Sequence, residues 1–369
     1  MNRTIKISIL IIQLLISTVI LAGAQANSQV VRLIKSVVPG QPVIAKNLTL
    51  VPLYSDLEQP FLDLVTFEQA MRAGRLSIEE LDGGTVPQVV FYSTAGKPVF
   101  ILGGEIITGC KQDRIIGHDV LISPGRQNLR VPVFCVESGR WTAETGVFYS
   151  QKNMGTSYLR REAQNDNMSS QGKIWSKIDE MNSKLGIDSH TSAYQDAYET
   201  VDIRHQLAQY EHHIKRGWPV SPQVVGVLVA VDGEVISLDL FASHALLSGF
   251  WEKLSKAAIY TALQTANVEP DTAVDVGAFL AAVAEKEYIT QQGVDLGFEV
   301  SAVDAELSVS GLIYHDRLIH LAAFPNDTAA AEPYYYEQQL QENDIFQYNN
   351  YHDNGHANLN QEFFQYQGR

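Results

Sequence analysis

Five basic residues lie close together in a glycine-rich stretch of a chain that is otherwise acidic. The stretch runs from Gly103 to Trp141, and its cations are Lys111, Arg114, Arg126, Arg130 and Arg140. Arginine binds carboxylates and phosphates through two parallel hydrogen bonds, and lysine adds a compact positive charge. If these side chains converge in the fold, they form a site for a small anion. The residues expected to contact it are Lys111, Gln112, Arg114, Glu137 and Arg140.

Acidic and aromatic residues extend this hypothetical site. Glu105 and Glu137 are the candidates for holding sugar hydroxyls or for acid–base catalysis, which requires a carboxyl pKa displaced by burial or by a close like charge. Trp141 and Trp175 are the candidates for stacking on a flat ring. The alternative is structural, because Glu137 and Arg140 fall in one turn and such residues often form ion pairs. The residues alone leave both readings open.

The two cysteines of the chain, Cys110 and Cys135, fall in the same stretch. In an exported protein they can form a disulfide, which would close a loop of about 25 residues and stabilise the fold by about 3 kcal/mol. A second possibility is two buried thiols on neighbouring strands. A third is a nucleophilic Cys110 whose thiol pKa is lowered by Lys111.

Residues 1–26 have the three-part pattern of a secretory signal peptide. Arg3 and Lys6 precede an apolar run over 7–23, and Ala24 and Ala26 offer a small-x-small cleavage site. We therefore expect an extracytoplasmic protein, periplasmic or secreted, that contacts a membrane only through this segment if it stays uncleaved. The formal net charge of −15 disfavours nucleic acid as a partner.

The last segment, 331–369, is rich in Gln, Asn and Tyr and poor in aliphatic residues. Such a composition buries too little apolar surface to order a chain, so it predicts a disordered tail, whose aromatic residues suit a protein partner. His352 and His356 have the spacing of helical metal ligands, but Asp353, Asn354 and Gly355 between them oppose a helix. We predict no metal site and no cofactor.

Between these segments, residues 27–330 are expected to form one α+β domain. Its first lobe, about 40–141, is predicted to be an antiparallel sheet or sandwich. The elements expected there are an edge strand within 42–54, a helix over 67–76 capped by Thr66, and strands over 86–92, 98–108, 114–122 and 129–136. The middle of the chain is expected to be helical, over 173–185 and 192–215.

The second lobe, about 171–325, is predicted to be α/β with antiparallel hairpins. Asp232-Gly233 lies between two alternating apolar runs, which is the strongest hairpin signal in the chain. Ser243 and Asp275 are expected to cap helices. The sequence contains no Gly-x-Ser-x-Gly, no Gly-x-Gly-x-x-Gly, no phosphate-binding loop and no His-Glu-x-x-His motif.

Several blocks of residues resemble the ARG and rhodanese-phosphatase-superfamily-associated protein domain. They are Gly104-Glu105, 111–114 (KQDR), 136–141 (VESGRW), Arg160-Arg161, 171–175 (QGKIW) and 250–254 (FWEKL). The resemblance runs from about residue 45 to Phe324. It adds Arg161 and Gln171 to the expected ligand contacts. The family has no established reaction, and its association with ADP-ribose-processing proteins implies a nucleotide-like or ADP-ribose-like ligand.

The sequence thus predicts an exported protein that binds a small anionic ligand between two lobes, with processing of that ligand as a further option. The alternative is a non-enzymatic structural or partner-binding protein of the envelope or the medium, in which the same charged residues hold the two lobes together. Whether the protein is an enzyme stays open at this point. A solvent-reachable pocket with unpaired cations would favour ligand binding, and closed, paired charges would favour the structural role.

Overall fold

The computed structural model describes residues 27–57, 62–81, 87–141, 146–165, 169–265 and 274–326. These residues belong to one compact unit, which extends to Asn326. The predicted signal peptide, 1–26, and the predicted tail, 331–369, lie outside the described residues. None of the helices in the described part of the chain is long and apolar enough to cross a membrane.

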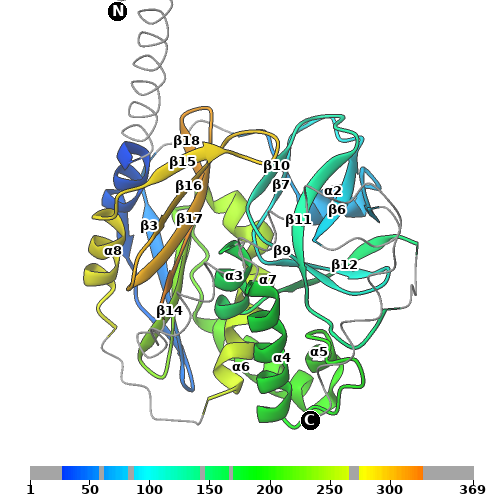
Figure 1. The fold of residues 1–369 in the computed structure, drawn as a ribbon. Coiled ribbons are helices and arrows are strands. Elements are labelled where there is room, and N and C mark those ends of the chain that lie inside the picture. Colours follow the sequence, from blue (N-terminus) through cyan, green and yellow to red (C-terminus); the bar gives the residue numbers. More distant parts are fainter. Residues whose placement is uncertain are drawn as a thin grey trace, which may run out of the picture. The chain divides into compact units, whose positions relative to one another are not determined.

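The largest sheet has nine strands, all paired antiparallel (Figure 1). Its order is β1-β3-β13-β14-β18-β17-β16-β15, and β2 also pairs with β3. The strands are β1 (Val37–Pro39), β2 (Val43–Ala45), β3 (Leu48–Ser55), β13 (Val224–Val231), β14 (Glu234–Phe241), β15 (Ile289–Gln292), β16 (Phe298–Val303), β17 (Leu307–Tyr314) and β18 (Arg317–Pro325). The β13–β14 hairpin turns at Asp232-Gly233, as predicted, with positive φ at both residues.

The prediction of an edge strand within 42–54 is wrong for β3, which lies inside the large sheet. One of its sides pairs with β13, and the other side is shared by β2 and β1. Pro52, which suggested an edge, falls between the β2 and β1 pairings, and its carbonyl accepts a hydrogen bond from Gly40. A proline is tolerated here because its partner strand is interrupted at this point. This N-terminal segment therefore joins the strands of the C-terminal half.

Two smaller sheets contain most of the remaining strands. The six-stranded sheet has the order β12-β8-β9-β11-β6-β5, and the three-stranded sheet has the order β10-β7-β4. The strands are β4 (Val65–Thr66), β5 (Leu76–Glu80), β6 (Gln88–Ser93), β7 (Val99–Ile101), β8 (Glu105–Gly109), β9 (Arg114–Ile116), β10 (Val120–Ile122), β11 (Leu129–Cys135) and β12 (Phe148–Met154). The strands expected over 98–108 and 114–122 are each divided, and their halves belong to different sheets.

Helices cover the sheets and link them. They are α2 (Phe67–Arg72), α3 (Ser157–Gln164), α4 (Ser170–Lys184), α5 (Asp196–Glu199), α6 (Val201–Gly217), α7 (His244–Leu263) and α8 (Val276–Ala284), and residues 27–35 are also helical. Thr66, Ser243 and Asp275 cap their helices as predicted. The α+β fold class is thereby confirmed.

Both faces of the large sheet are covered by helices. Residues 27–35 and α8 pack on one face, where Leu33 and Leu280 meet Leu53 and Leu228. On the other face α6 and α7 pack, and α7 also contacts β12 of the six-stranded sheet. Helix α7 is apolar on most sides because it is buried between two sheets. This position brings its polar residues inside the molecule, where they need partners.

Candidate functional site

Three of the five predicted cations, Lys111, Arg114 and Arg140, lie in one region beside β8, β9 and β11, and Arg140 is fully engaged. Arg140 donates to both carboxylate oxygens of Glu137, at 2.8 and 2.6 Å, and to Asp113 at 3.2 Å. It also donates to the carbonyl of Cys110 at 2.7 Å. We call Arg140, Glu137 and Asp113 the Arg140 cluster. Its side chains are at most 10% exposed, so it is a nearly buried ion network.

Other predicted contacts surround this cluster. Arg114 is buried, and its guanidinium donates to the carbonyls of Gln112 and Asp113 and to the Gln112 side chain. The Lys111 ammonium lies over the Trp141 ring, 5.2 Å from its centroid. The Gln171 amide exchanges two hydrogen bonds with the backbone of Cys135. These contacts fix the loops next to β8, β9 and β11.

The remaining predicted residues lie apart from the Arg140 cluster. Arg126 pairs with Asp295, and Arg130 is exposed on β11. Arg161 donates to the carbonyl of Pro325 and lies over the Tyr158 ring. Trp175 belongs to α4, and its ring nitrogen is buried without a partner among the described residues. Seven of the residues predicted to contact a ligand thus lie in or beside the Arg140 cluster, namely Lys111, Gln112, Arg114, Glu137, Arg140, Trp141 and Gln171, and the others lie elsewhere.

The two cysteines are buried thiols, and no disulfide joins them. Cys110 follows β8, and Cys135 ends β11. Burial is the main reason that the pKa of each thiol is raised to about 11. A thiol with such a pKa stays protonated near neutral pH, which disfavours the nucleophilic role considered for Cys110.

The turn from Leu102 to Glu105, between β7 and β8, is the point where two further ionic groups meet. The Leu102 amide donates to Glu105, and the Gly103 amide donates to Asp119. The Gly103 carbonyl accepts from Arg160. Gly104 has φ +100°, and a Cβ there would lie 2.4 Å from the Arg160 side chain. Only glycine therefore allows this turn to approach Arg160 so closely.

The first of these groups is the Lys253 cluster, which consists of Lys253, Glu105 and Glu68. The Lys253 ammonium contacts Glu105, and its distance to Glu68 is 2.7 Å. Burial raises the pKa of Glu105 although Lys253 opposes this. Burial lowers the pKa of Lys253, but the two carboxylates outweigh it and raise the value above that of an ordinary lysine. Both shifts favour retention of a proton, because one cation faces two acids in a dry site.

The second group is a buried chain of alternating charges, the His320 chain. Arg160 donates to both oxygens of Asp239, at 3.0 and 2.6 Å. His320 lies between Asp239 and Asp119, at 3.1 and 2.7 Å. Burial opposes a charged imidazole, but the two carboxylates raise the pKa of His320. Burial likewise acts against a charged Asp239, yet Arg160 and His320 hold its pKa below the usual range.

A pocket of about 240 Å³ adjoins the Lys253 cluster, and we call it the α2–α7 pocket. It is lined by residues of both helices and of β12, namely Thr66, Glu68, Gln69, Arg72, Lys152, Ser248, Gly249, Glu252 and Lys253. Glu252 accepts a hydrogen bond from Lys256, which is the main cause of its lowered pKa, and the charge of Lys152 contributes. The pocket thus lies at the junction of segments from both predicted lobes.

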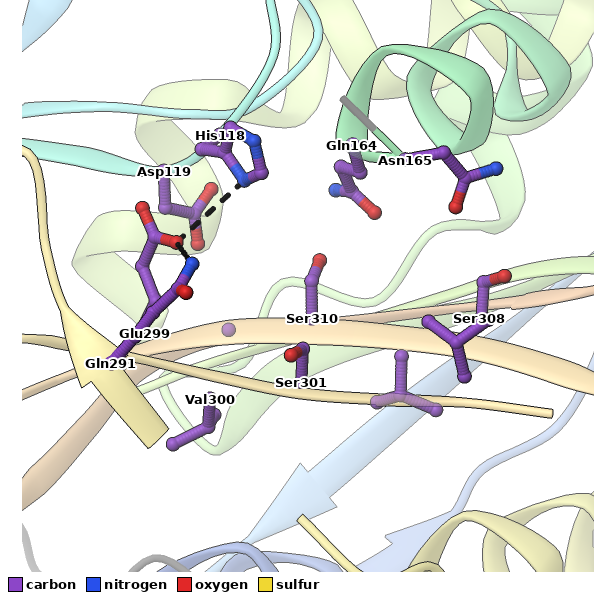
Figure 2. A pocket seen from close by; sticks show the side chains of 13 residues that line it. His118, Asp119, Gln164, Asn165, Gln291, Glu299, Val300, Ser301, Ser308 and Ser310 are labelled. Carbon is purple, nitrogen blue, oxygen red and sulfur yellow. Dashed lines mark hydrogen bonds and ion pairs between the residues drawn. The ribbon is translucent and has the colours of Figure 1, made fainter. Parts of the chain in front are cut away.

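A second pocket, of about 460 Å³, lies beside the end of the His320 chain, and we call it the His118 pocket (Figure 2). His118 and Asp119 precede β10, Gln164 and Asn165 come from the end of α3, and the other labelled residues come from β15 to β17. Among the described residues, no group of three or more His, Cys, Asp or Glu side chains is placed to hold a metal ion.

Sequence reasoning missed most residues of these two groups. Lys253 falls in the 250–254 (FWEKL) block of the family resemblance, and the other local signal is a charged residue within an otherwise apolar helix. Asp239 and His320 are separated by 81 residues, and His320 and Asp119 by 201. No local pattern joins partners at such distances.

The fold and its sites define an α+β domain with buried ionic groups on either side of one glycine turn. The model of the ARG and Rhodanese-Phosphatase-superfamily-associated Protein domain matches residues 36–324, and the chain belongs to this family. The resemblance stated from the sequence is thereby confirmed. No curated protein and no solved structure matches the chain.

Proposed function

We propose that this protein binds a small anion, a carboxylate or a phosphate, in the α2–α7 pocket. The observation that carries the proposal is a surplus of positive charge. Glu68 is engaged by Lys253, and Glu252 is engaged by Lys256. Arg72 and Lys152 line the same pocket and have no carboxylate within ion-pair distance among the described residues. Two cations therefore remain for a ligand.

The local charge contrasts with that of the whole chain. Four cations, Arg72, Lys152, Lys253 and Lys256, stand against the three carboxylates of Glu68, Glu105 and Glu252. The protein as a whole carries −15. A positive pocket in an acidic protein attracts anions and concentrates them locally.

The size of the pocket limits what it can hold. About 240 Å³ suits a small carboxylate or the phosphate end of a larger molecule, and it lies below the usual range for complete drug-sized ligands. A nucleotide-like ligand, which the family resemblance suggests, would place a phosphate near Arg72 and extend its base outside. Glu105 is fully buried, so its role here is to hold Lys253 rather than to touch the ligand.

Thermal unfolding in the presence of inorganic phosphate, citrate or AMP tests this function. A ligand that binds only the folded state raises the melting temperature in proportion to its saturation of the site. We expect Arg72→Gln and Lys152→Gln to leave the unliganded protein nearly unchanged, since both side chains are exposed, and to remove the ligand-induced rise. Arg130→Gln, which removes an exposed cation outside the pocket, is the matched control.

The proposal fails if none of the three anions raises the melting temperature, or if Arg130→Gln and Arg72→Gln reduce the rise equally. Equal reductions would mean that the anions act through the general charge of the protein. The Arg140 cluster favours the second candidate function for its own region, a structural role, because its charges are paired and nearly buried. In that role the cluster holds the loops next to β8 and β11 in place.

Export and partner binding complete the proposal. The signal-like pattern of residues 1–26 supports an extracytoplasmic location, periplasmic or secreted, and the composition of 331–369 supports a protein partner for that segment. Both segments lie outside the described residues. The mass of the protein recovered from its native compartment tests export, because cleavage near Asn27 would remove the first 26 residues.

A further inference from the structure

The His118 pocket contains polar groups that the fold does not use. The hydroxyls of Ser301 and Ser310 have no hydrogen-bond partner among the described residues, although the two residues face each other on β16 and β17. The Gln164 amide also has no partner within the described chain. Figure 2 shows Gln164 and Ser310 reaching into the pocket from opposite walls. These groups can each donate and accept a hydrogen bond.

One carboxylate is available beside them. Oxygen Oε2 of Glu299 accepts from Gln291 at 2.7 Å and lies 3.8 Å from Nδ1 of His118. Its other oxygen has no partner among the described residues. Asp119 differs, because its two oxygens are already used by the Gly103 amide and by His320. The pocket therefore offers one acidic acceptor, one imidazole and several neutral donors and acceptors.

The charges and hydrogen-bonding groups of the lining determine which kind of ligand the pocket favours. Among the described residues, no Arg or Lys lines the pocket, so an anion would meet Glu299 and Asp119 without a compensating cation from this part of the chain. Hydroxyl groups match serine, amide and carboxylate partners well, because each hydroxyl both donates and accepts. The volume of about 460 Å³ falls within the range of small-molecule sites and holds a molecule of monosaccharide size.

The wall of the pocket is also held rigidly. His118 and Asp119 follow Gly117, at which a Cβ would lie 2.9 Å from the Ala163 carbonyl, so this loop packs closely on α3. Asp119 is fixed by the Gly103 amide and by the buried His320. Because this wall is already fixed, the protein loses little conformational entropy when a ligand binds. Weak hydrogen bonds to the ligand then contribute more to the net affinity.

From these observations we propose that the His118 pocket is a second binding site, for an uncharged hydroxyl-rich molecule of the sugar or polyol class. Glu299, Gln164 and Ser310 would bind its hydroxyl groups. The site is separate from the α2–α7 pocket, and its acidic and neutral lining disfavours the anions that the α2–α7 pocket attracts. Each of the two proposals can therefore be tested and rejected without affecting the other.

Ligand-observed NMR titration of the full protein tests this site. The probes are glucose, galactose, mannose, ribose and myo-inositol, with phosphate and putrescine as charged comparisons. We expect at least one uncharged probe to bind saturably in the millimolar range. Ser310→Ala and Glu299→Gln should each weaken it by about tenfold, as expected for one lost hydrogen bond to a polar or charged partner.

Ser77→Ala on β5 is the matched control, because it removes an exposed strand serine elsewhere and should leave binding unchanged. The proposal is overturned if no uncharged probe binds, if the pocket variants and Ser77→Ala behave alike, or if only putrescine or phosphate responds to the pocket variants. Should Glu299→Gln fail to fold, the partly exposed Ser310 and Gln164, each changed to Ala, carry the test. Phosphate binding to the same variants shows separately whether the α2–α7 pocket is intact.

Discussion

The Arg140 cluster and the Lys253 cluster have the same composition, one cation that meets two carboxylates, but they have different surroundings. Arg140 binds Glu137 and Asp113 within neighbouring loops, and the residues of this cluster line neither the α2–α7 pocket nor the His118 pocket. Lys253 binds Glu105 and Glu68 from three distant segments, and two further cations line the pocket beside it.

This difference shows why convergence of charged residues does not by itself define a binding site. A cation that is neutralised by its own neighbours holds loops together and has little left for a ligand. A binding site for an anion needs cations that are not already paired within the fold and that solvent can reach. The Lys253 cluster supplies the buried support, and Arg72 and Lys152 supply the excess.

The largest expected effect comes from removing the cation of the buried cluster. Lys253→Met leaves Glu105 and Glu68 facing each other in a dry site, so we expect a loss of about 3 to 5 kcal/mol in the free energy of unfolding. Urea unfolding followed by tryptophan fluorescence measures it. Lys256→Met, three residues further along α7, removes only an exposed pair and should cost about 0.5 kcal/mol or less. Similar losses for both variants would contradict a buried role for Lys253.

A smaller effect is expected from the corresponding change in the Arg140 cluster. Arg140→Ala leaves Glu137 and Asp113 nearly buried, but the site is slightly more open, so we expect a loss of about 2 to 3 kcal/mol. The rise in melting temperature produced by phosphate should stay the same, because Arg140 is not part of the α2–α7 pocket. A stable Arg140→Ala protein that no longer responds to phosphate would move the anion site to the Arg140 cluster.

The parts of the fold that the sequence predicted correctly are those with local signals. The N-terminal cap of α2 is visible in Thr66, and the β13–β14 turn is visible in Asp232-Gly233. The division of the strand expected over 98–108 was missed, because the reason for it is a close approach of Arg160 to Gly104. That approach depends on a helix more than 50 residues away.

The pairings in the candidate site could likewise be predicted only where the partners are close in the sequence. Glu137 and Arg140 are three residues apart, so their pairing could be foreseen as one of two alternatives. Glu68 and Lys253 lie far apart in the sequence, and only the packing of α2 near α7 brings them together. Lys152, which completes the pocket, lies on an irregular part of β12 with positive φ, and no sequence pattern marks it.

The smallest expected effect is a change in the pH dependence of stability, and it comes from the His320 chain. The folded state raises the pKa of His320 above 6.5, so its contribution to stability is complete below about pH 6.5 and is lost as the pH rises through the folded value. Asp119→Asn removes one of the two carboxylates that cause the shift. We expect the loss of stability to begin at lower pH in this variant, with a difference of about 1.4 kcal/mol for each unit of pKa.

Urea unfolding at pH values from about 6 to 9 measures this difference. His205→Asn, which changes an exposed histidine on α6, should leave the pH dependence of stability unchanged. If Asp119→Asn and the unaltered protein lose stability over the same pH range, His320 is not held as an imidazolium by Asp119. The neutral imidazole would then donate to only one of its two aspartates, and the His118 pocket would lose the fixed wall on which its proposed ligand site depends.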